Sequence, residues 1–284
     1  VNHGRMNPDY LKKAEIRELS AADWNASFSE VSSMLLARND EPLVTDYLEH
    51  LLEDADTPDA FAEWLEHGYL ERKFILAKLL AGKGNAAELG GKLSPMEYQT
   101  LKDRVEVTWL PTNPKLVAAD AAVALDVRVK NVKDLRVSIY DIDAAAVCRS
   151  LKKGVSDTLA LDGCAPTATR VIDCSDQPPL RRKLVHLAFD EVKQPGVYMI
   201  ECAGNGVCTR AILRKGRLSA SSRVSAAGVA VAVRGEDGSV CKDATLWLDG
   251  QFYKAGENGE IIVPFSSAKG SSEKTAVVAS GRLA

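Results

Sequence analysis

The sequence predicts an α+β multidomain fold, in which an N-terminal helical region is followed by two antiparallel β-sandwich modules. Two observations predict this fold. Up to about residue 103, apolar residues recur at spacings of three and four, which is the period of a helix buried along one side. From Val105 onward, apolar residues recur at every second position between tight turns, which is the period of half-buried strands. We therefore expect a helical domain at 1–104, a β-sandwich at 105–220 and a smaller β-sandwich at 221–284.

The overall composition is that of a globular protein, and it narrows the functional classes. A chain of 284 residues is long enough for two or three domains. The chain has a net charge of −3 and therefore lacks the broad positive charge of a nucleic-acid binder. No nucleic acid is expected as a partner. No apolar run approaches the roughly 20 residues that cross a bilayer, so no membrane span is expected either.

Several short helices are predicted before residue 104. Ser20 to Asp23 resembles a capping box, and apolar residues follow it at helical spacing, namely Trp24, Phe28, Val31 and Leu35. A second helix is expected to start at Thr57-Pro58-Asp59, because proline is tolerated at the first helical position, with its buried face formed by Phe61, Trp64 and Leu65. The apolar stripe continues with Leu70, Phe74, Leu76, Leu79 and Leu80. The last helix has Ser94 as its cap, then Pro95, and Glu97 three residues after the cap.

The middle of the chain is predicted to form the first sandwich. Alternating apolar residues mark its strands: Val105, Val107 and Trp109; Val123, Leu125, Val127 and Val129; Leu135, Val137 and Ile139; and Val185, Leu187 and Phe189. Asn205-Gly206 lies between two apolar runs and predicts a hairpin, because both central residues of a type I′ turn need positive φ. Residues 144–182 have no steady period and are expected to be a long excursion from the sheet.

The second sandwich is predicted to begin after the serine-rich stretch Ser219-Ala220-Ser221-Ser222. Val229, Val231 and Val233 alternate in its first strand, and Asp249-Gly250 turns the chain between two later strands. The last strand is expected at Ala276 to Ser280. Every recognisable connection in the β-rich part is a turn rather than a crossover helix, which favours antiparallel sheets over an α/β sheet.

Short motifs in the β-rich part carry a family resemblance. In residues 105–218 they are the opening strand Val107-Thr108-Trp109, the turn from Asn131 to Leu135 and the closing hairpin between Pro195 and Ala211. This stretch resembles a macroglobulin-type domain of the alpha-macroglobulin-like proteins. The segment from Asp237 to Ile261 resembles the small prealbumin-like β-sandwich repeat that is common in large surface proteins.

The resemblance implies a non-catalytic structural or binding module of a larger, extracytoplasmic protein (secreted, periplasmic or lumenal). Its partners would be other protein chains or domains of a larger assembly. Covalent trapping in that family needs a Cys-Gly-Glu-Gln thioester, and no cysteine here is followed by Gly-Glu-Gln. Two alternatives stay open: a stand-alone accessory subunit that docks through its helical region, and an enzyme whose site is assembled from distant residues.

Six cysteines lie in the second half of the chain. An even number in a β-rich region suits a secreted protein with disulfides, and six small free thiols are the alternative. Cys164 and Cys174 form the preferred bridge, which would add about 2–3 kcal/mol of stability. Cys202 and Cys208 bracket the hairpin tip and oppose each other only if the loop has five residues. No Cys-x-x-Cys pair is present and the four histidines are scattered, so no metal site is expected.

Basic residues form a predicted surface for an anionic partner, such as an acidic protein or a sulfated glycan. The surface consists of Arg181, Arg182, Lys183, Arg210 and Arg214. The alternative interpretation is a set of solvated charges at the entry to a strand.

Acidic residues gather near His50, namely Glu49, Glu53, Asp54 and Asp56. We expect them on a solvated face opposite Leu48, Leu51 and Leu52, because acid–base catalysis needs two carboxyl groups of unlike environment facing one cleft. The sequence also lacks the phosphate-binding, dinucleotide-binding, hydrolase and metalloprotease motifs. No catalytic residue and no cofactor is therefore predicted.

Overall fold

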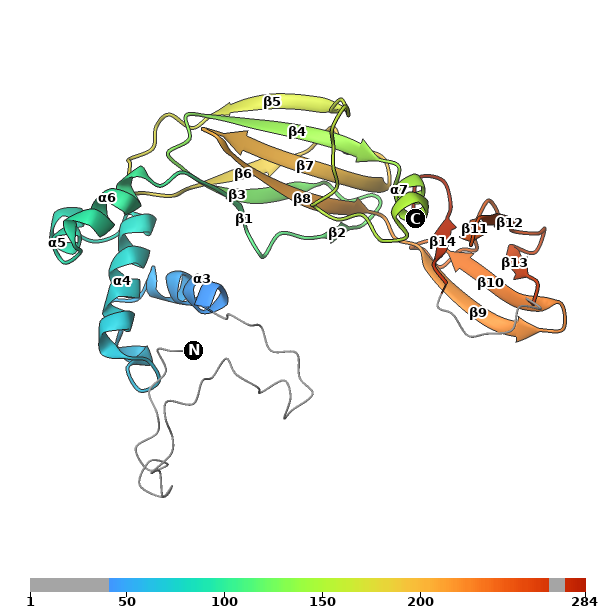
Figure 1. Ribbon diagram of the computed structural model, residues 1–284, viewed down its shortest axis with the longest axis horizontal. Helices are drawn as coiled ribbons and strands as arrows, with labels where there is room; N and C mark the ends of the chain where they lie inside the picture. The colour runs from blue at the N-terminus through green and yellow to red at the C-terminus, as the bar shows by residue number, and fades with distance from the viewer. Residues whose placement is uncertain (1–40, 266–273) are drawn as a thin grey trace, which may run out of the picture. The chain divides into compact units, whose positions relative to one another are not determined.

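The computed structural model describes residues 41–265 and 274–284. The chain divides into two compact units, Val1–Arg104 with Gln177–Arg182, and Val105–Asp176 with Lys183–Ala284. The predicted capping box at Ser20 and the apolar residues from Trp24 to Leu35 lie outside the described residues. The described part is helical up to Asp103 and mostly antiparallel β-sheet beyond it (Figure 1), so the predicted α+β class is confirmed.

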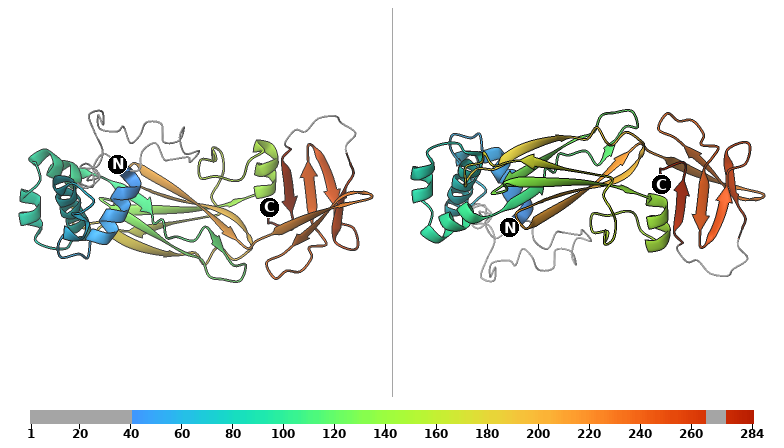
Figure 2. Two further views of the ribbon diagram at one scale, coloured as in Figure 1. Left: turned by 90° about the horizontal axis from the view of Figure 1, so that it is seen from below. Right: turned by 90° about the horizontal axis from the view of Figure 1, so that it is seen from above.

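The first unit is a group of short helices, coloured blue to green in Figures 1 and 2. They are α3 (Glu41–Leu52), α4 (His67–Ala81), α5 (Ala86–Gly91) and α6 (Pro95–Asp103), with one 3₁₀ turn, η1, at Asp59–Phe61. Helices α3 and α4 pack through Leu48, Leu52, Tyr69, Leu70 and Ala77. A second cluster joins α4 to the segments that follow it, through Ile75, Leu79, Leu80, Leu93 and Leu101.

The helix ends follow the predicted capping chemistry. The Oγ of Ser94 accepts the backbone N–H of Glu97 at 3.3 Å, and the Glu97 carboxylate accepts the backbone N–H of Ser94 at 3.1 Å. This is the capping box that the sequence predicts. Helix α4 ends at Gly82, whose φ of 69° lies in the left-handed region that glycine tolerates best.

Three expectations for the helical unit are wrong. Thr57-Pro58-Asp59 opens only one 3₁₀ turn, and Trp64 is 59% exposed instead of buried. Leu51 is 48% exposed, so only Leu48 and Leu52 of the proposed stripe are buried. Glu49 does not lie on a solvated face, since it forms an ion pair with Arg182 in which both side chains are largely covered.

The second unit contains the first sandwich, which is built from two sheets. The smaller sheet has the order β1-β3-β6, with β1 at Glu106–Trp109, β3 at Ala124–Lys130 and β6 at Lys183–Ala188. The larger has the order β2-β8-β7-β4-β5, with β2 at Leu116–Val117, β8 at Val207–Lys215, β7 at Gly196–Gly204, β4 at Asp134–Ile142 and β5 at Ala168–Asp173. Their inward residues form one continuous core that includes Val127, Leu135, Ile200 and Leu213.

The β7–β8 hairpin has the predicted two-residue turn. Asn205 and Gly206 both have positive φ, at 45° and 81°, as a type I′ turn requires. The register pairs Gly204 with Val207 and Ala203 with Cys208.

Three features of this unit differ from the expectation. Residues 144–182 are not one excursion, since they contain helix α7 (Ala144–Leu151) and the edge strand β5. Helix α7 begins where the Asp143 carboxylate accepts the backbone N–H of Ala146 at 2.9 Å. Strand β2 pairs with β8 in parallel, which is the exception among antiparallel pairs of the described strands. Residues 177–182 belong to the helical unit rather than to the sandwich.

The second sandwich consists of two three-stranded sheets, drawn in orange to red in Figure 1. One has the order β13-β10-β9, with β13 at Glu260–Val263, β10 at Gly228–Arg234 and β9 at Ser219–Ser225. The other has the order β12-β11-β14, with β12 at Gln251–Lys254, β11 at Thr245–Leu248 and β14 at Ala276–Ala279. The serine-rich stretch at 219–222 is therefore the start of a strand. The core between these sheets is small and consists of Val231, Val233, Ala244, Leu246 and Ile261.

Candidate functional site

Most of the predicted anion-binding residues are already engaged inside their own unit. Arg182 pairs with Glu49 and donates its backbone N–H to the Leu80 carbonyl at 2.8 Å. Lys183 pairs with Asp176. The Nε of Arg210 donates to Glu201 at 2.8 Å, and Arg214 donates to the Val155 carbonyl at 3.3 Å. The side chains that we expected to bind an anionic partner therefore already have partners within the chain.

Arg181 differs from this set, because it is exposed and forms no ion pair with a described residue. It borders a hollow of about 320 Å³ in the helical unit. The cationic lining residues are Lys83, Lys102 and Arg181, and the apolar ones include Leu79 and Leu180. No residue lining the hollow in the described part of the chain is acidic.

The segment 177–182 forms one wall of the hollow, and two contacts hold it there. The backbone N–H of Arg181 donates to the Pro178 carbonyl at 3.1 Å, which closes a turn. Leu180 packs against the cluster around Leu79 and Leu80. Together with the Arg182 contacts, this fixes the backbone from which the Arg181 side chain leaves. The backbone of this wall is hydrogen-bonded, and the Arg181 side chain is exposed.

Gly82 lines the hollow beside Arg181, and its lack of a side chain is required for two reasons. Its φ of 69° lies in the left-handed region, and a Cβ at this position would lie 2.8 Å from the Arg181 Cδ. A larger residue would therefore both strain the end of α4 and displace the arginine.

Lys83, one of the cations at the hollow, has an acidic partner outside the lining. Lys83 donates to Asp54, and this hydrogen bond lowers the pKa of the Asp54 carboxyl. Because an arginine fork matches the geometry of a carboxylate, the arrangement suits an acidic group presented by another molecule. Arg181 was predicted from the sequence as part of an anion-binding surface. The sequence could not show that Lys83 and Lys102, about 80–100 positions earlier, border the same hollow.

All six cysteines are free thiols in the structure. Cys164 is exposed and Cys174 is buried, and their bridge stays a prediction. Cys202 pairs across the hairpin with Thr209, and Cys208 pairs with Ala203, so Cys202 and Cys208 point to opposite faces of the sheet. Burial raises the pKa of the Cys202 thiol to about 12 and also raises the pKa of Cys174. Both thiols are therefore poor nucleophiles at neutral pH.

In the parts 41–265 and 274–284, no three His, Cys, Asp or Glu side chains come together as ligands for a metal ion. The same parts contain no helix that is long and apolar enough to cross a membrane.

Comparison with known families finds two matches. Residues 2–105 match the Actin-binding protein F N-terminal domain, and residues 135–216 match the AbpF first immunoglobulin-like domain. The curated Actin-binding protein F of Dictyostelium discoideum is 26% identical over 265 residues, which is 93% of this chain and 11% of that relative. The chain thus spans about a tenth of the length of the relative it matches.

Similar solved structures include two fragments of native alpha-2-macroglobulin from Escherichia coli. One, spanning domains MG0, NIE and MG1, has a TM-score of 0.38 at 16% identity and covers 61% of this chain and 64% of its own. The other, spanning NIE and MG1, has a TM-score of 0.36 at 16% identity and covers 61% of this chain and 96% of its own.

These comparisons correct two expectations. The sequence similarity is to an actin-binding protein with immunoglobulin-like domains, so the resemblance to macroglobulins holds only for the β-sandwich type. The expected extracytoplasmic location is wrong, because the relative is named for binding actin, a cytoskeletal protein, and not for a secreted or lumenal role. The free thiols need no oxidising compartment.

Proposed function

We propose that this chain is a non-catalytic protein-binding segment of a long actin-binding protein, and that its helical unit contacts an acidic patch of the actin filament. The observation that carries this proposal is the similarity to Actin-binding protein F, which extends over 93% of the chain and includes both units. In this proposal residues 1–104 are the contact domain, and 105–220 and 221–284 are supporting β-sandwich modules.

The cationic hollow is the part of the helical unit that best supports such a contact. Its exposed Arg181 forms no ion pair with a described residue, and Leu79 and Leu180 add apolar surface beside it. Arginine anchors beside small apolar pockets are typical of protein interfaces. The net charge of −3 also makes nonspecific attraction to an acidic filament an inadequate explanation for binding.

Cosedimentation of the 284-residue chain with actin filaments tests the proposal. We expect the chain to pellet with filaments, and the dissociation constant to rise with salt because exposed ion pairs are screened. Arg181→Glu should raise the dissociation constant by about tenfold, since it places a like charge at the contact. Lys133→Glu is the matched control, because it changes the net charge equally at an exposed turn of the first sandwich.

Each outcome has a distinct meaning. A wild-type chain that stays in the supernatant at every filament concentration overturns direct actin contact by this segment. Pelleting that Arg181→Glu and Lys133→Glu weaken equally overturns the hollow as the contact.

A further inference from the structure

Strand β9 presents an unprotected edge of the second sandwich. Among the described residues it pairs only with β10, and its residues from Ser219 to Val224 are all exposed. Val224 is 77% exposed. Natural edge strands are commonly guarded by lysine, proline, a bulge or a covering segment. The sequence Ser-Ala-Ser-Ser-Arg-Val-Ser contains no lysine or proline, and its register with β10 runs without a bulge.

The backbone of β9 directs alternate residues toward the free edge. On the far side of β10, the Cys241 N–H donates to the Val233 carbonyl at 2.9 Å, so Val233 points away from β9. Alternation then directs Ala230 and Ala232 toward β9, where they pair with Arg223 and Ser221. The β9 residues at the alternate positions, Ala220, Ser222 and Val224, therefore direct their N–H and C=O groups outward.

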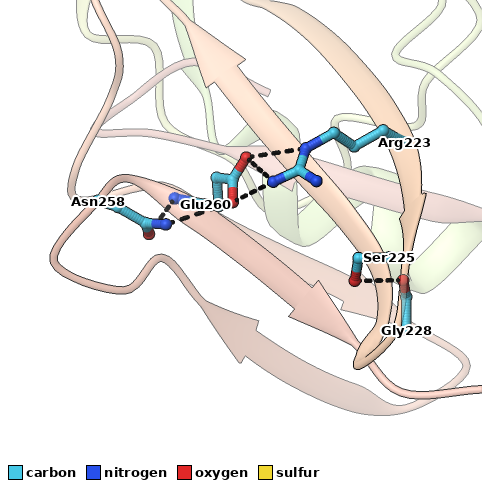
Figure 3. A network of polar contacts seen from close by, with 5 residues as sticks. All are labelled: Arg223, Ser225, Gly228, Asn258 and Glu260. Atoms are coloured by element: carbon cyan, nitrogen blue, oxygen red, sulfur yellow. Dashed lines mark hydrogen bonds and ion pairs between the residues drawn. The ribbon is translucent and has the colours of Figure 1, made fainter.

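The single charge on β9 is turned away from this edge. Figure 3 shows the Arg223 side chain reaching across β10 to Glu260 on β13. Its Nη2 donates to both Glu260 carboxylate oxygens at 2.9 Å, and its Nε donates to one of them at 3.2 Å. Asn258 donates to the same carboxylate at 3.3 Å. The guanidinium thus covers the outer face over the small Ala230 and does not guard the strand edge.

We propose that a second copy of this chain adds to β9 as an antiparallel strand, which joins the two β13-β10-β9 sheets across a two-fold axis. With the axis at Ser222, the serine meets its own equivalent, and Ala220 meets Val224 of the second copy. Each such pair exchanges two main-chain hydrogen bonds, so every outward group of these residues finds a partner. Val224 gains the cover that it lacks in one copy.

Self-association fits β9 better than an arbitrary strand does, because the strand is complementary to itself. In the register centred on Ser222, Arg223 lies opposite Ser221 of the second copy. A slip of the axis to Arg223 would place two arginines directly opposite each other, which is destabilising. Two-fold pairing through one shared patch is also the commonest way in which a chain associates with itself.

Sedimentation equilibrium of the 284-residue chain tests the proposal. We expect a reversible monomer–dimer equilibrium. Val224→Lys should raise the dimer dissociation constant at least about tenfold, because a charged side chain would have to be buried at the new pair. Val171→Lys is the matched control, since Val171 is 60% exposed on β5, the edge strand of the first sandwich. It should leave the dissociation constant unchanged.

Ser222→Pro is a second variant that spares the fold. It removes an outward N–H that β10 does not use, and proline is tolerated on such edge strands. It should abolish the dimer while the circular dichroism spectrum stays that of the wild type. A chain that is monomeric at every accessible concentration overturns the proposal, and so does a dimer that both Val224→Lys and Ser222→Pro leave intact.

Cross-linking tests the register independently of these variants. With the exposed Cys164 and Cys208 replaced by serine, Ser222→Cys should form a covalent dimer on mild oxidation, because paired Cα atoms about 5.5 Å apart suit a disulfide. Ser225→Cys, three residues from the axis, should not. Cross-linking that is equal at both positions overturns the register and with it the self-complementary edge.

Discussion

Both β-sandwiches consist of strands with alternating apolar residues, but an arginine on an edge strand makes different contacts in each. In the first sandwich, Arg170 on edge strand β5 donates to the Ala188 carbonyl at the end of edge strand β6 at 2.5 Å, and its guanidinium lies 5.0 Å from the centre of the Phe189 ring. This links the edges of the two sheets. In the second sandwich, Arg223 on β9 extends across its own sheet to Glu260 on β13 and makes no contact that covers the β9 edge.

The two sandwiches also differ in the size of their hydrophobic cores. The core cluster of the first sandwich is extensive, whereas the core cluster of the second contains five buried residues in the described part of the chain. The difference teaches that a β-sandwich with a small core and an unlinked edge has more to gain from a partner strand than one with a large core and linked edges. Small domains bury a smaller share of their apolar surface, so each core residue matters more.

The largest expected effect comes from truncating one core residue in each sandwich. Ile200→Ala and Ile261→Ala each remove a side chain with 0% exposure and should each cost about 3–4 kcal/mol. A small sandwich has roughly 3–5 kcal/mol to lose, so Ile261→Ala should unfold β9 to β14 while β1 to β8 stay folded. Ile200→Ala should weaken the first sandwich without unfolding it. Hydrogen exchange measured strand by strand checks both outcomes.

Loss of protection in all strands together, in either variant, would contradict this comparison. It would mean that the two sandwiches unfold as one cooperative unit.

The second effect concerns the two arginines. Arg170→Met removes a charged hydrogen bond and the contact with Phe189, and should lower the unfolding free energy of the first sandwich by about 1–2 kcal/mol. Arg223→Met removes an exposed ion pair and should cost about 0.5 kcal/mol or less. Urea titrations with hydrogen exchange at β5 and at β9 would measure the two losses. A larger loss for Arg223→Met would reverse the contrast between the edges.

The smallest effect is a pH dependence in one turn of each sandwich. Hydrogen bonds from Ser175 lower the pKa of Asp173 below its ordinary 3.8, and those from Ser239 lower the pKa of Asp237 in the same way. A carboxyl whose pKa is lowered on folding stabilises the protein above its unfolded pKa, and this contribution is lost as the pH falls through the folded value. Asp173→Asn and Asp237→Asn should each flatten the acid side of the stability curve.

Salt separates the two turns. The pKa of Asp173 is also lowered by the charge of Lys183, whereas Asp237 is held by a serine and backbone groups. Urea midpoints measured from about pH 5 downward should therefore lose the part of the Asp173 contribution that comes from Lys183 in high salt, and should keep the Asp237 contribution. Equal salt sensitivity at both positions would show that Lys183 does not contribute.

Features whose cause lies within a few residues could be predicted from the sequence. The turn at Asn205-Gly206 and the cap at Ser94 were predicted because positive φ and helix capping are local requirements. Burial was predicted less well. Trp64 and Leu51 fit a helical stripe, yet both are exposed, because burial also requires a surface to pack against. The candidate site shows the same limit, since Arg181 was named but its neighbours in the hollow were not.

The sequence by itself determined the α+β class, the switch from helices to strands after residue 103 and the turns that set the hairpin register, because periodicity and turn chemistry act over short distances. Only the tertiary structure decided which charges are engaged and which edges stay open. Glu49 meets Arg182 across 133 positions, and the serine-rich β9 becomes a strand because β10 offers it hydrogen bonds. Pairing partners that lie far apart in the chain leave no local pattern, so the fold alone reveals them.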